Sequence, residues 1–471
     1  MRTVAVDAAQ NRTGLQARSA QVSKGKGPFT IILLALLFEF GRPQEIIPGI
    51  KVIPFASLLD GLLILSVLNA GKFNLAKKQT KFWVALFALM VVHVPIAVNN
   101  FWAAMLVKDM FLTFGLYLGI ITFVDSLDRF NRVMKVWLGV HAILAVLGVL
   151  NHGQGVGGWL GDENDFCMEM DVAAAFALFM MSSKGVGVSR PMYIGLLCLF
   201  VLAAMATMSR GGFIGLAAVG IYWWIRSPNK IMPIFLGIIV VMFMALAAPD
   251  AYWERIKSTT DEENLSSEGG GTGAARLYTW GIGLEMFFHN PIIGVGQGNF
   301  PWTFEEYQGD RTWEGKSLAG RAAHSMYFTL LPELGLVGLA IFLGMLVNSF
   351  KDLKWVSHAA VECEVPTRHK IRVIETTDEI RRRNGIRSAL FLARAIEAGF
   401  IAYLVASIFV ATLYYPTFWV LVAFSVALRN CVANEVESEG EQREHALGAR
   451  SLGKVRRSTF SSGAKEEFRP S

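Results

Sequence analysis

The sequence predicts an all-α, polytopic membrane protein with about 12 transmembrane helices and one large loop outside the membrane. Hydrophobic residues make up 53% of its 471 residues and charged residues only 17%, and the mean hydropathy is +0.42. Apolar runs of bilayer-spanning length recur along most of the chain. A soluble domain of this size needs a more polar surface, so the composition excludes an ordinary soluble protein.

The apolar runs define the expected organisation of the chain. A hydrophilic segment at 1–27 has no apolar core with a small-residue cleavage site, so we interpret it as a cytoplasmic tail and not as a signal peptide. Helices 1–9 are expected within 28–249, a large outward loop at 250–323, helices 10–12 within 324–430 with a cytoplasmic loop at 350–387, and a disordered cytoplasmic tail at 431–471. The expected spans are 28–47, 53–69, 82–98, 103–124, 133–150, 169–183, 191–208, 212–226, 231–249, 324–349, 388–411 and 414–430.

The distribution of positive charge predicts the orientation. Most of the 44 Lys and Arg residues lie in the two tails and in every second connection between spans. The positive-inside rule therefore places both termini and the 350–387 loop in the cytoplasm, and the 250–323 loop outside. In such a protein the net charge of +6 reflects topology and does not indicate a nucleic-acid partner. The four cysteines are scattered, which argues against a zinc site, a redox pair or a disulfide framework.

Two arginines on the outward side are candidate anion ligands. Arg276 follows a Gly-rich stretch and begins an amphipathic pattern that ends at His289-Asn290-Pro291, which predicts a helix lying on the bilayer surface. The first turn of that helix is expected to offer free backbone N–H groups beside the guanidinium, a suitable setting for a phosphate. Arg210 lies in the short turn Ser209-Arg210-Gly211-Gly212 between two spans, where a charge needs solvent or a partner. The alternatives are that Arg276 pairs with a lipid headgroup or a loop carboxylate, and that the Arg210 side chain extends to the outer membrane interface.

His324 is the candidate general base. Only three of the eight histidines are expected to face outward, namely His152, His289 and His324. His289 belongs to the Asn-Pro helix stop, whereas His324 opens a long apolar helix at the depth of a lipid-linked phosphate. A histidine with a near-neutral pKa can accept a proton from an attacking hydroxyl. The alternative is an interfacial histidine bonded to a carbonyl group.

Two further outward segments carry polar residues. Asp162 and Asp165 belong to an acidic cluster, Gly161–Asp165, which suits a divalent cation or a hydroxyl-rich sugar, or alternatively solvation and helix capping. The Gly-rich segment 294–298 has neither a P-loop lysine nor a preceding strand, so it predicts a turn and not a nucleotide site. Gln297 and Asn299, in and beside that turn, are weaker candidates for contact with an acceptor or a sugar.

The order of these motifs resembles the O-antigen ligase/polymerase superfamily, the membrane proteins with a Wzy_C-type domain. The similarity covers roughly 195–350. Its most specific part is His324-Ser325, then nine residues, then Gly335-Leu336-Val337-Gly338. The Ser-Arg-Gly-Gly turn, the stretch from Arg276 to Trp280 and the His-Asn-Pro segment also look like this family, although ligases usually have leucine at the position of Trp280. The segment around Asp162 is similar to one in ligase-like proteins of exosortase systems.

The resemblance implies a GT-C-type, metal-independent, inverting glycosyltransferase of the bacterial inner membrane, with no cofactor. Its donor would be a glycan on undecaprenyl diphosphate at the periplasmic face, and its acceptor a glycan, lipid or protein hydroxyl. Arg210 and Arg276 would then hold the diphosphate, and His324 would deprotonate or orient the acceptor. Arg321, three residues before the histidine, is a further candidate anion ligand. Ligation and repeat-unit polymerisation both remain open.

The alternative hypothesis is a non-enzymatic exporter or flippase of the same lipid-linked sugars. A transporter is expected to place its charged residues along a path through the middle of the bilayer. The cations singled out above cluster at the outer surface, which favours an enzyme.

Overall fold

The computed structural model describes residues 26–73, 75–183, 189–247, 272–313, 315–362 and 377–438. These residues are 78% helical, and the one β-bridge among them joins Trp313 and Lys316. The helices are α2 (Lys26–Phe40), α3 (Pro43–Ile46), η1 (Ile50–Val52), α4 (Phe55–Asn69), α5 (Lys78–His93), α6 (Asn100–Phe123), α7 (Leu127–Leu150), η2 (Gly158–Leu160), α8 (Glu163–Met180), α9 (Arg190–Ala206), α10 (Arg210–Arg226), α11 (Ile231–Ala247), α13 (Thr272–His289), α14 (Phe300–Gln308), α15 (Tyr327–Glu362), α16 (Thr377–Ala406) and a C-terminal helix (Pro416–Ser438).

The all-helical class is confirmed, and a helix lies over each of the twelve expected spans. Within the described residues, five helices are long and apolar enough to cross a membrane: α6, α7, α15, the Arg383–Ala406 part of α16, and the C-terminal helix. The other helices over expected spans are shorter, so the twelve-span layout and its orientation stay predictions. Both expected tails lie largely outside the described residues.

Several boundaries differ from the expected ones because helices continue past the apolar runs. Helix α15 extends to Glu362 and α16 starts at Thr377, so helix covers both ends of the expected 350–387 loop. The C-terminal helix continues to Ser438, beyond the expected boundary at 430. Charged residues that end a hydropathy run do not end a helix, because Lys, Arg and Glu have good helix propensity.

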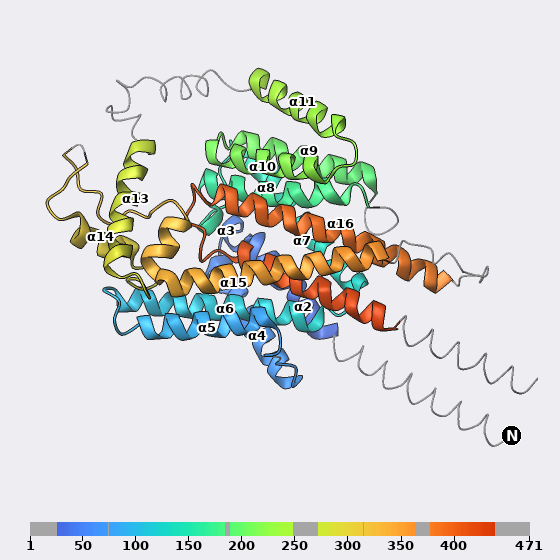
Figure 1. Cartoon of the computed structure of the whole chain (residues 1–471), viewed down its shortest axis with the longest axis horizontal. Helices are drawn as coiled ribbons and strands as arrows, with labels where there is room; N and C mark the ends of the chain where they lie inside the picture. The colour runs from blue at the N-terminus through green and yellow to red at the C-terminus, as the bar shows by residue number, and fades with distance from the viewer. Residues whose placement is uncertain are drawn as a thin grey trace, which may run out of the picture.

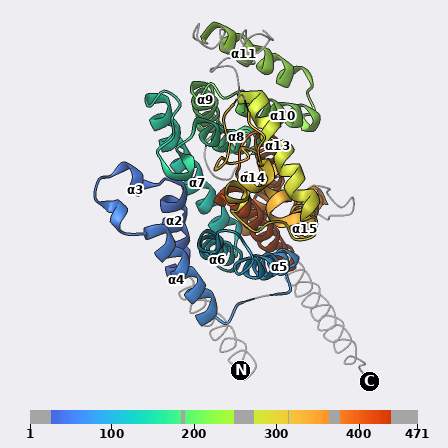
Figure 2. The same ribbon diagram turned by 90° about the vertical axis from the view of Figure 1, so that its left-hand side faces the viewer.

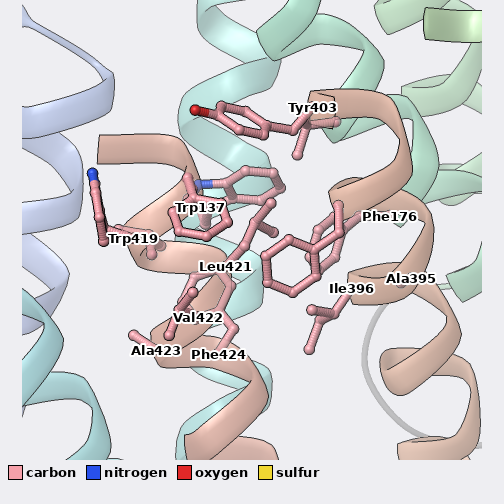
Figure 3. Packing of buried hydrophobic residues seen from close by; sticks show 14 of the residues in the cluster. Trp137, Phe176, Ala395, Ile396, Tyr403, Trp419, Leu421, Val422, Ala423 and Phe424 are labelled. Carbon is pink, nitrogen blue, oxygen red and sulfur yellow. The ribbon is translucent and has the colours of Figure 1, made fainter. Parts of the chain in front are cut away.

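The long helices run side by side in one bundle, and α13 crosses one end of it (Figures 1 and 2). One hydrophobic core runs through the bundle, and its centre includes residues of α7, α8, α16 and the C-terminal helix. Figure 3 shows part of it, where Trp137 packs against Phe176 at 4.9 Å and against Phe424 at 6.2 Å between ring centroids. This packing holds α8 and α16, whose ends contact the segments that carry Arg210 and His324.

The end of α13 agrees with the prediction, but its start does not. It ends at His289, where Pro291 stops the helix, but it begins at Thr272, so Arg276 lies inside the helix and not at its first N–H groups. One side of α13 packs on the protein, because Ile282 and Met286 are buried in a small cluster with residues of α14 and the following loop. Leu277 and Phe288 are exposed, so their contact with the bilayer surface stays a prediction.

Candidate functional site

Hydrogen bonds between capping residues join the N-termini of α8 and α10. Asp162 caps α8, and its Oδ1 accepts from the backbone N of Asn164 at 2.8 Å and from Asn164 Nδ2 at 2.9 Å. Ser209 caps α10 and donates from Oγ to Asn164 Oδ1 at 2.7 Å, while accepting from Gly212 N at 3.1 Å. The expected capping role of Asp162 is therefore confirmed, and Asn164 holds the acidic segment against the turn that carries Arg210.

Helix α13 contacts the start of α15 directly beside His324. The Trp280 indole donates from Nε1 to the backbone O of Ala323 at 2.8 Å. The same ring stacks on Phe328 with centroids 4.6 Å apart and an interplanar angle of 4°. Arg276 lies one helical turn before Trp280 on the same side of α13, so this contact brings the arginine towards the histidine.

The charges that shift the pKa values of Arg276 and His324 indicate that five of the predicted site residues lie in one cluster: Arg210, Arg276, Arg321, His324 and Asp162. The pKa of Arg276 is lowered by burial and then by the charge of Arg210, against an opposing contribution from Asp162. The pKa of His324 is lowered from its ordinary 6.5 first by burial and next by Arg276; Asp162 opposes this and Arg321 adds to it. The His324 side chain is accessible to solvent, yet enough protein surrounds it to disfavour the charged ring. His324 is consequently neutral at neutral pH, as a proton acceptor must be.

The backbone is strained at two points of this cluster. His324 has φ of 47°, and Met208, two residues before Arg210, has φ of 53°. A left-handed conformation is costly for non-glycine residues and persists only where the surroundings impose it. Both the histidine and the turn before Arg210 are therefore held in specific conformations.

The Gly335–Gly338 motif has a structural role. Helix α15 contains Pro332 and a break at Gly335, where φ is 62° and ψ is −161°. Residues 291–296, which follow α13, lie against this break. Four backbone hydrogen bonds join the segments: Val295 N to Pro332 O (2.9 Å), Gly296 N to Glu333 O (2.9 Å), Leu336 N to Pro291 O (2.9 Å) and Val337 N to Ile292 O (3.0 Å). The motif thus attaches the end of α13 to the helix that begins after His324.

Gly335→Ala is expected to destabilise the protein. A Cβ at this position would lie 2.5 Å from the Ile292 carbonyl oxygen, in addition to the cost of the positive φ. We expect a loss of about 1–3 kcal/mol, measured as a lower midpoint of thermal unfolding in detergent. Gly281→Ala is the matched control, because nothing lies within 4 Å of its Cβ position and it sits inside α13. A stable Gly335→Ala protein would contradict this role for the motif.

Gln297 and Asn299 are buried and bonded within the protein. Gln297 donates to the carbonyl oxygens of Met90 at 2.9 Å and Ala103 at 3.2 Å, and its Oε1 lies 3.1 Å from His93 Nδ1. Asn299 accepts from the backbone N of Asn99 at 2.7 Å. Both side chains therefore fix the Gly-rich turn on the α5–α6 connection, and their contact with a sugar stays a prediction that requires this turn to open. The predicted turn itself is confirmed, with positive φ at Gly294, Gly296 and Gly298.

The segment before the C-terminal helix and the first turn of that helix contain residues that the sequence analysis did not identify. Three hydroxyl groups bind buried carboxylates: Tyr414 to Glu333 Oε2 at 2.6 Å, Tyr415 to Asp165 Oδ2 at 3.3 Å and Thr417 to Glu169 Oε2 at 2.7 Å. Asp165 is 8% exposed, so it is buried and not in open solvent, and its contact with a sugar stays a prediction. The only sequence signal was a pair of tyrosines before Pro416, because the partner acids lie on α8 and α15.

No arrangement that favours a metal ion is found among the described residues. They contain no group of three or more His, Cys, Asp or Glu side chains placed to hold one. Asp162 directs one oxygen to the α8 cap, and Asp165 binds Tyr415. Cys167 and Cys431 are buried apart from one another and Cys198 is exposed. Cys363 lies outside the described residues.

The fold and the site define a helical membrane protein with a cationic cluster and a neutral histidine at one end of its bundle. Residues 194–343 match the family model described as O-antigen ligase (Wzy_C). No curated protein matches the chain. The chain thus carries an O-antigen ligase-type domain, which supports its place in the O-antigen ligase-like superfamily. The matched segment contains Arg210, Arg276 and His324, whereas Asp162 lies outside it and reaches the cluster only through the fold.

Proposed function

We propose that this protein transfers a glycan from undecaprenyl diphosphate to an acceptor hydroxyl at the periplasmic face of the bacterial inner membrane. The observation that carries the proposal is the cluster of Arg210 and Arg276 beside His324, with Arg321 close enough to affect the histidine. Two guanidinium groups held together despite their repulsion suit a diphosphate, whose negative charge grows as the glycosidic bond breaks. The family match supports an enzyme of this class.

In the proposed reaction the acceptor oxygen attacks the anomeric carbon as the bond to the diphosphate oxygen breaks. Neutral His324 takes the acceptor proton, and the arginines retain undecaprenyl diphosphate as the leaving group. A direct displacement inverts the anomeric configuration. A diphosphate is already a good leaving group, so positive charge and positioning suffice and the proposed mechanism needs no metal ion.

Reconstituted vesicles test this function against the exporter hypothesis. With donor and acceptor on one face, an enzyme releases undecaprenyl diphosphate and elongates the acceptor, whereas a flippase only relocates the donor. We expect transfer at an unchanged rate in EDTA. Relocation without a new glycosidic bond would refute the proposal, and loss of transfer in EDTA that a divalent cation restores would refute its metal-free form. The identity of the acceptor distinguishes the two reactions. Ligation consumes a lipid or protein acceptor, whereas polymerisation joins the glycan to another glycan.

The pH dependence of transfer follows from the charges around His324. Because its pKa is lowered, the acid limb of kcat/KM is expected below the ordinary histidine value of 6.5. Asp162 raises this pKa, so Asp162→Asn, which still caps α8, should move the limb to lower pH. Arg321 lowers it, so Arg321→Gln should move the limb to higher pH. If the acid limb does not shift to lower pH in Asp162→Asn and to higher pH in Arg321→Gln, His324 is not the titrating base.

A further inference from the structure

Trp280 and Phe328 fix the position of the segment that carries His324. His324 lies between two buried residues, Ala323 and Ser325, which are 2% and 0% exposed. On the N-terminal side, the carbonyl of Ala323 accepts the Trp280 indole N–H at 2.8 Å. On the C-terminal side, the backbone N of Met326 donates to Ser407 O at 2.9 Å, just after α16 ends. The strained histidine is therefore held at both ends by elements distant in sequence.

The N-terminal contact differs from the C-terminal one because it originates from the helix that carries Arg276. Arg276 and Trp280 lie four residues apart on α13, so they project from the same side one turn apart. Trp280 also stacks nearly parallel on Phe328, in the first turn of α15, which fixes the orientation of its N–H. A single rigid helix thus positions both the proposed diphosphate ligand and the backbone of the proposed base.

We propose that Trp280 is a positioning residue for His324, setting the distance between the histidine and the anion held by Arg276. The inference rests on the proposed function and assigns a role to a side chain that touches neither substrate. An apolar side chain at position 280 would fill the same space without an N–H group for the Ala323 carbonyl. That carbonyl would then lose its partner, and the left-handed conformation at His324 would lose one of its two restraints.

Trp280→Phe tests the donor without removing the aromatic stack. We expect kcat to fall by about 10- to 100-fold, because small misplacements of a catalytic group have effects of this size. KM for the lipid-linked donor should not change, since the arginines remain. Trp302→Phe is the matched control, because Trp302 is an exposed tryptophan on α14. Phe328→Leu, which keeps the donor but removes the stack, should show a smaller loss of kcat.

Two further measurements separate positioning from general stability. The double variant Trp280→Phe/His324→Ala should transfer at the same rate as His324→Ala alone, because the tryptophan acts only through the histidine. A further loss in the double variant would overturn the proposal. Trp280→Phe should lower the thermal unfolding midpoint in detergent by only a few degrees, the cost of one lost hydrogen bond, and a much larger drop would assign the residue to stability instead.

A labelling experiment tests the contact between Trp280 and Ala323 independently of glycan transfer. His324→Cys, in a background with Cys198 and Cys363 replaced by Ala, is reacted with a membrane-impermeant maleimide. We expect Trp280→Phe to increase the labelling rate several-fold and Trp302→Phe to leave it unchanged. An unchanged rate in Trp280→Phe overturns the positioning role whatever the transfer rate. If the wild type transfers no glycan, the proposed function fails, while this experiment still reports whether Trp280 holds the segment.

Discussion

His324→Ala is expected to lower the rate of glycan transfer by about 10²- to 10⁴-fold, the usual contribution of a positioned general base. The protein should insert and unfold as the wild type does, because the side chain is exposed and removing it leaves no cavity. Donor binding should persist, since the arginines are unchanged. The rate is measured as release of undecaprenyl diphosphate from vesicles under single-turnover conditions, which separates chemistry from product release.

His289→Ala provides the matched control for that experiment. His289 is an exposed histidine at the end of α13, and its ring nitrogen Nδ1 lies 2.8 Å from the carbonyl oxygen of Glu285. It lies on α13, the helix that also carries Arg276, but its ring contacts Glu285 and Tyr307 and not the cluster residues. Transfer by His289→Ala should therefore equal that of the wild type. A stably inserted His324→Ala protein with normal transfer would instead remove the base from the proposed mechanism.

Local chemistry explains why much of the site could be predicted from the sequence. The end of α13 follows from Asn290-Pro291, and the start of α10 follows from the Ser209 cap next to two glycines. Long apolar runs similarly indicate helices wherever they occur. Arg210 and His324 could be named because each stands at or just before the start of such an element, and Arg276 because it begins the amphipathic pattern, although the helix itself starts at Thr272.

The partners of these residues could not be predicted, because they are set by contacts between distant segments. Gln297 has the sequence context of an exposed loop residue, but the end of α5 and the start of α6, about 200 positions away, bury it. Trp280 fits the apolar stripe of a surface helix equally well, and only its contact with Ala323 shows that it faces the protein. Asn164, which links the Asp162 and Ser209 caps, has no sequence signal beyond its acidic neighbours.

Arg276→Lys is expected to lower transfer by about 100-fold, close to the loss of one oxyanion-stabilising donor in other enzymes. Lysine keeps the charge but replaces a planar, two-pronged donor with a single ammonium, which cannot bind two phosphate oxygens in a fixed geometry. If Arg276 served only to contact lipid headgroups, the charge alone would suffice and lysine would be fully active. The rate of the Lys variant therefore distinguishes the two interpretations that its sequence context left open.

Arg311→Lys is the matched control for this substitution. Arg311 is an exposed arginine in the same loop region whose guanidinium binds both carboxylate oxygens of Glu285, at 2.6 Å and 2.7 Å. Such a surface pair contributes little, so Arg311→Lys should leave transfer unchanged. Arg210→Lys should resemble Arg276→Lys, and the double variant should lose less than the product of the two single losses, because both groups act on one diphosphate. Strictly multiplicative losses would mean that the two arginines bind separate anions, and the shared-diphosphate mechanism would then fail.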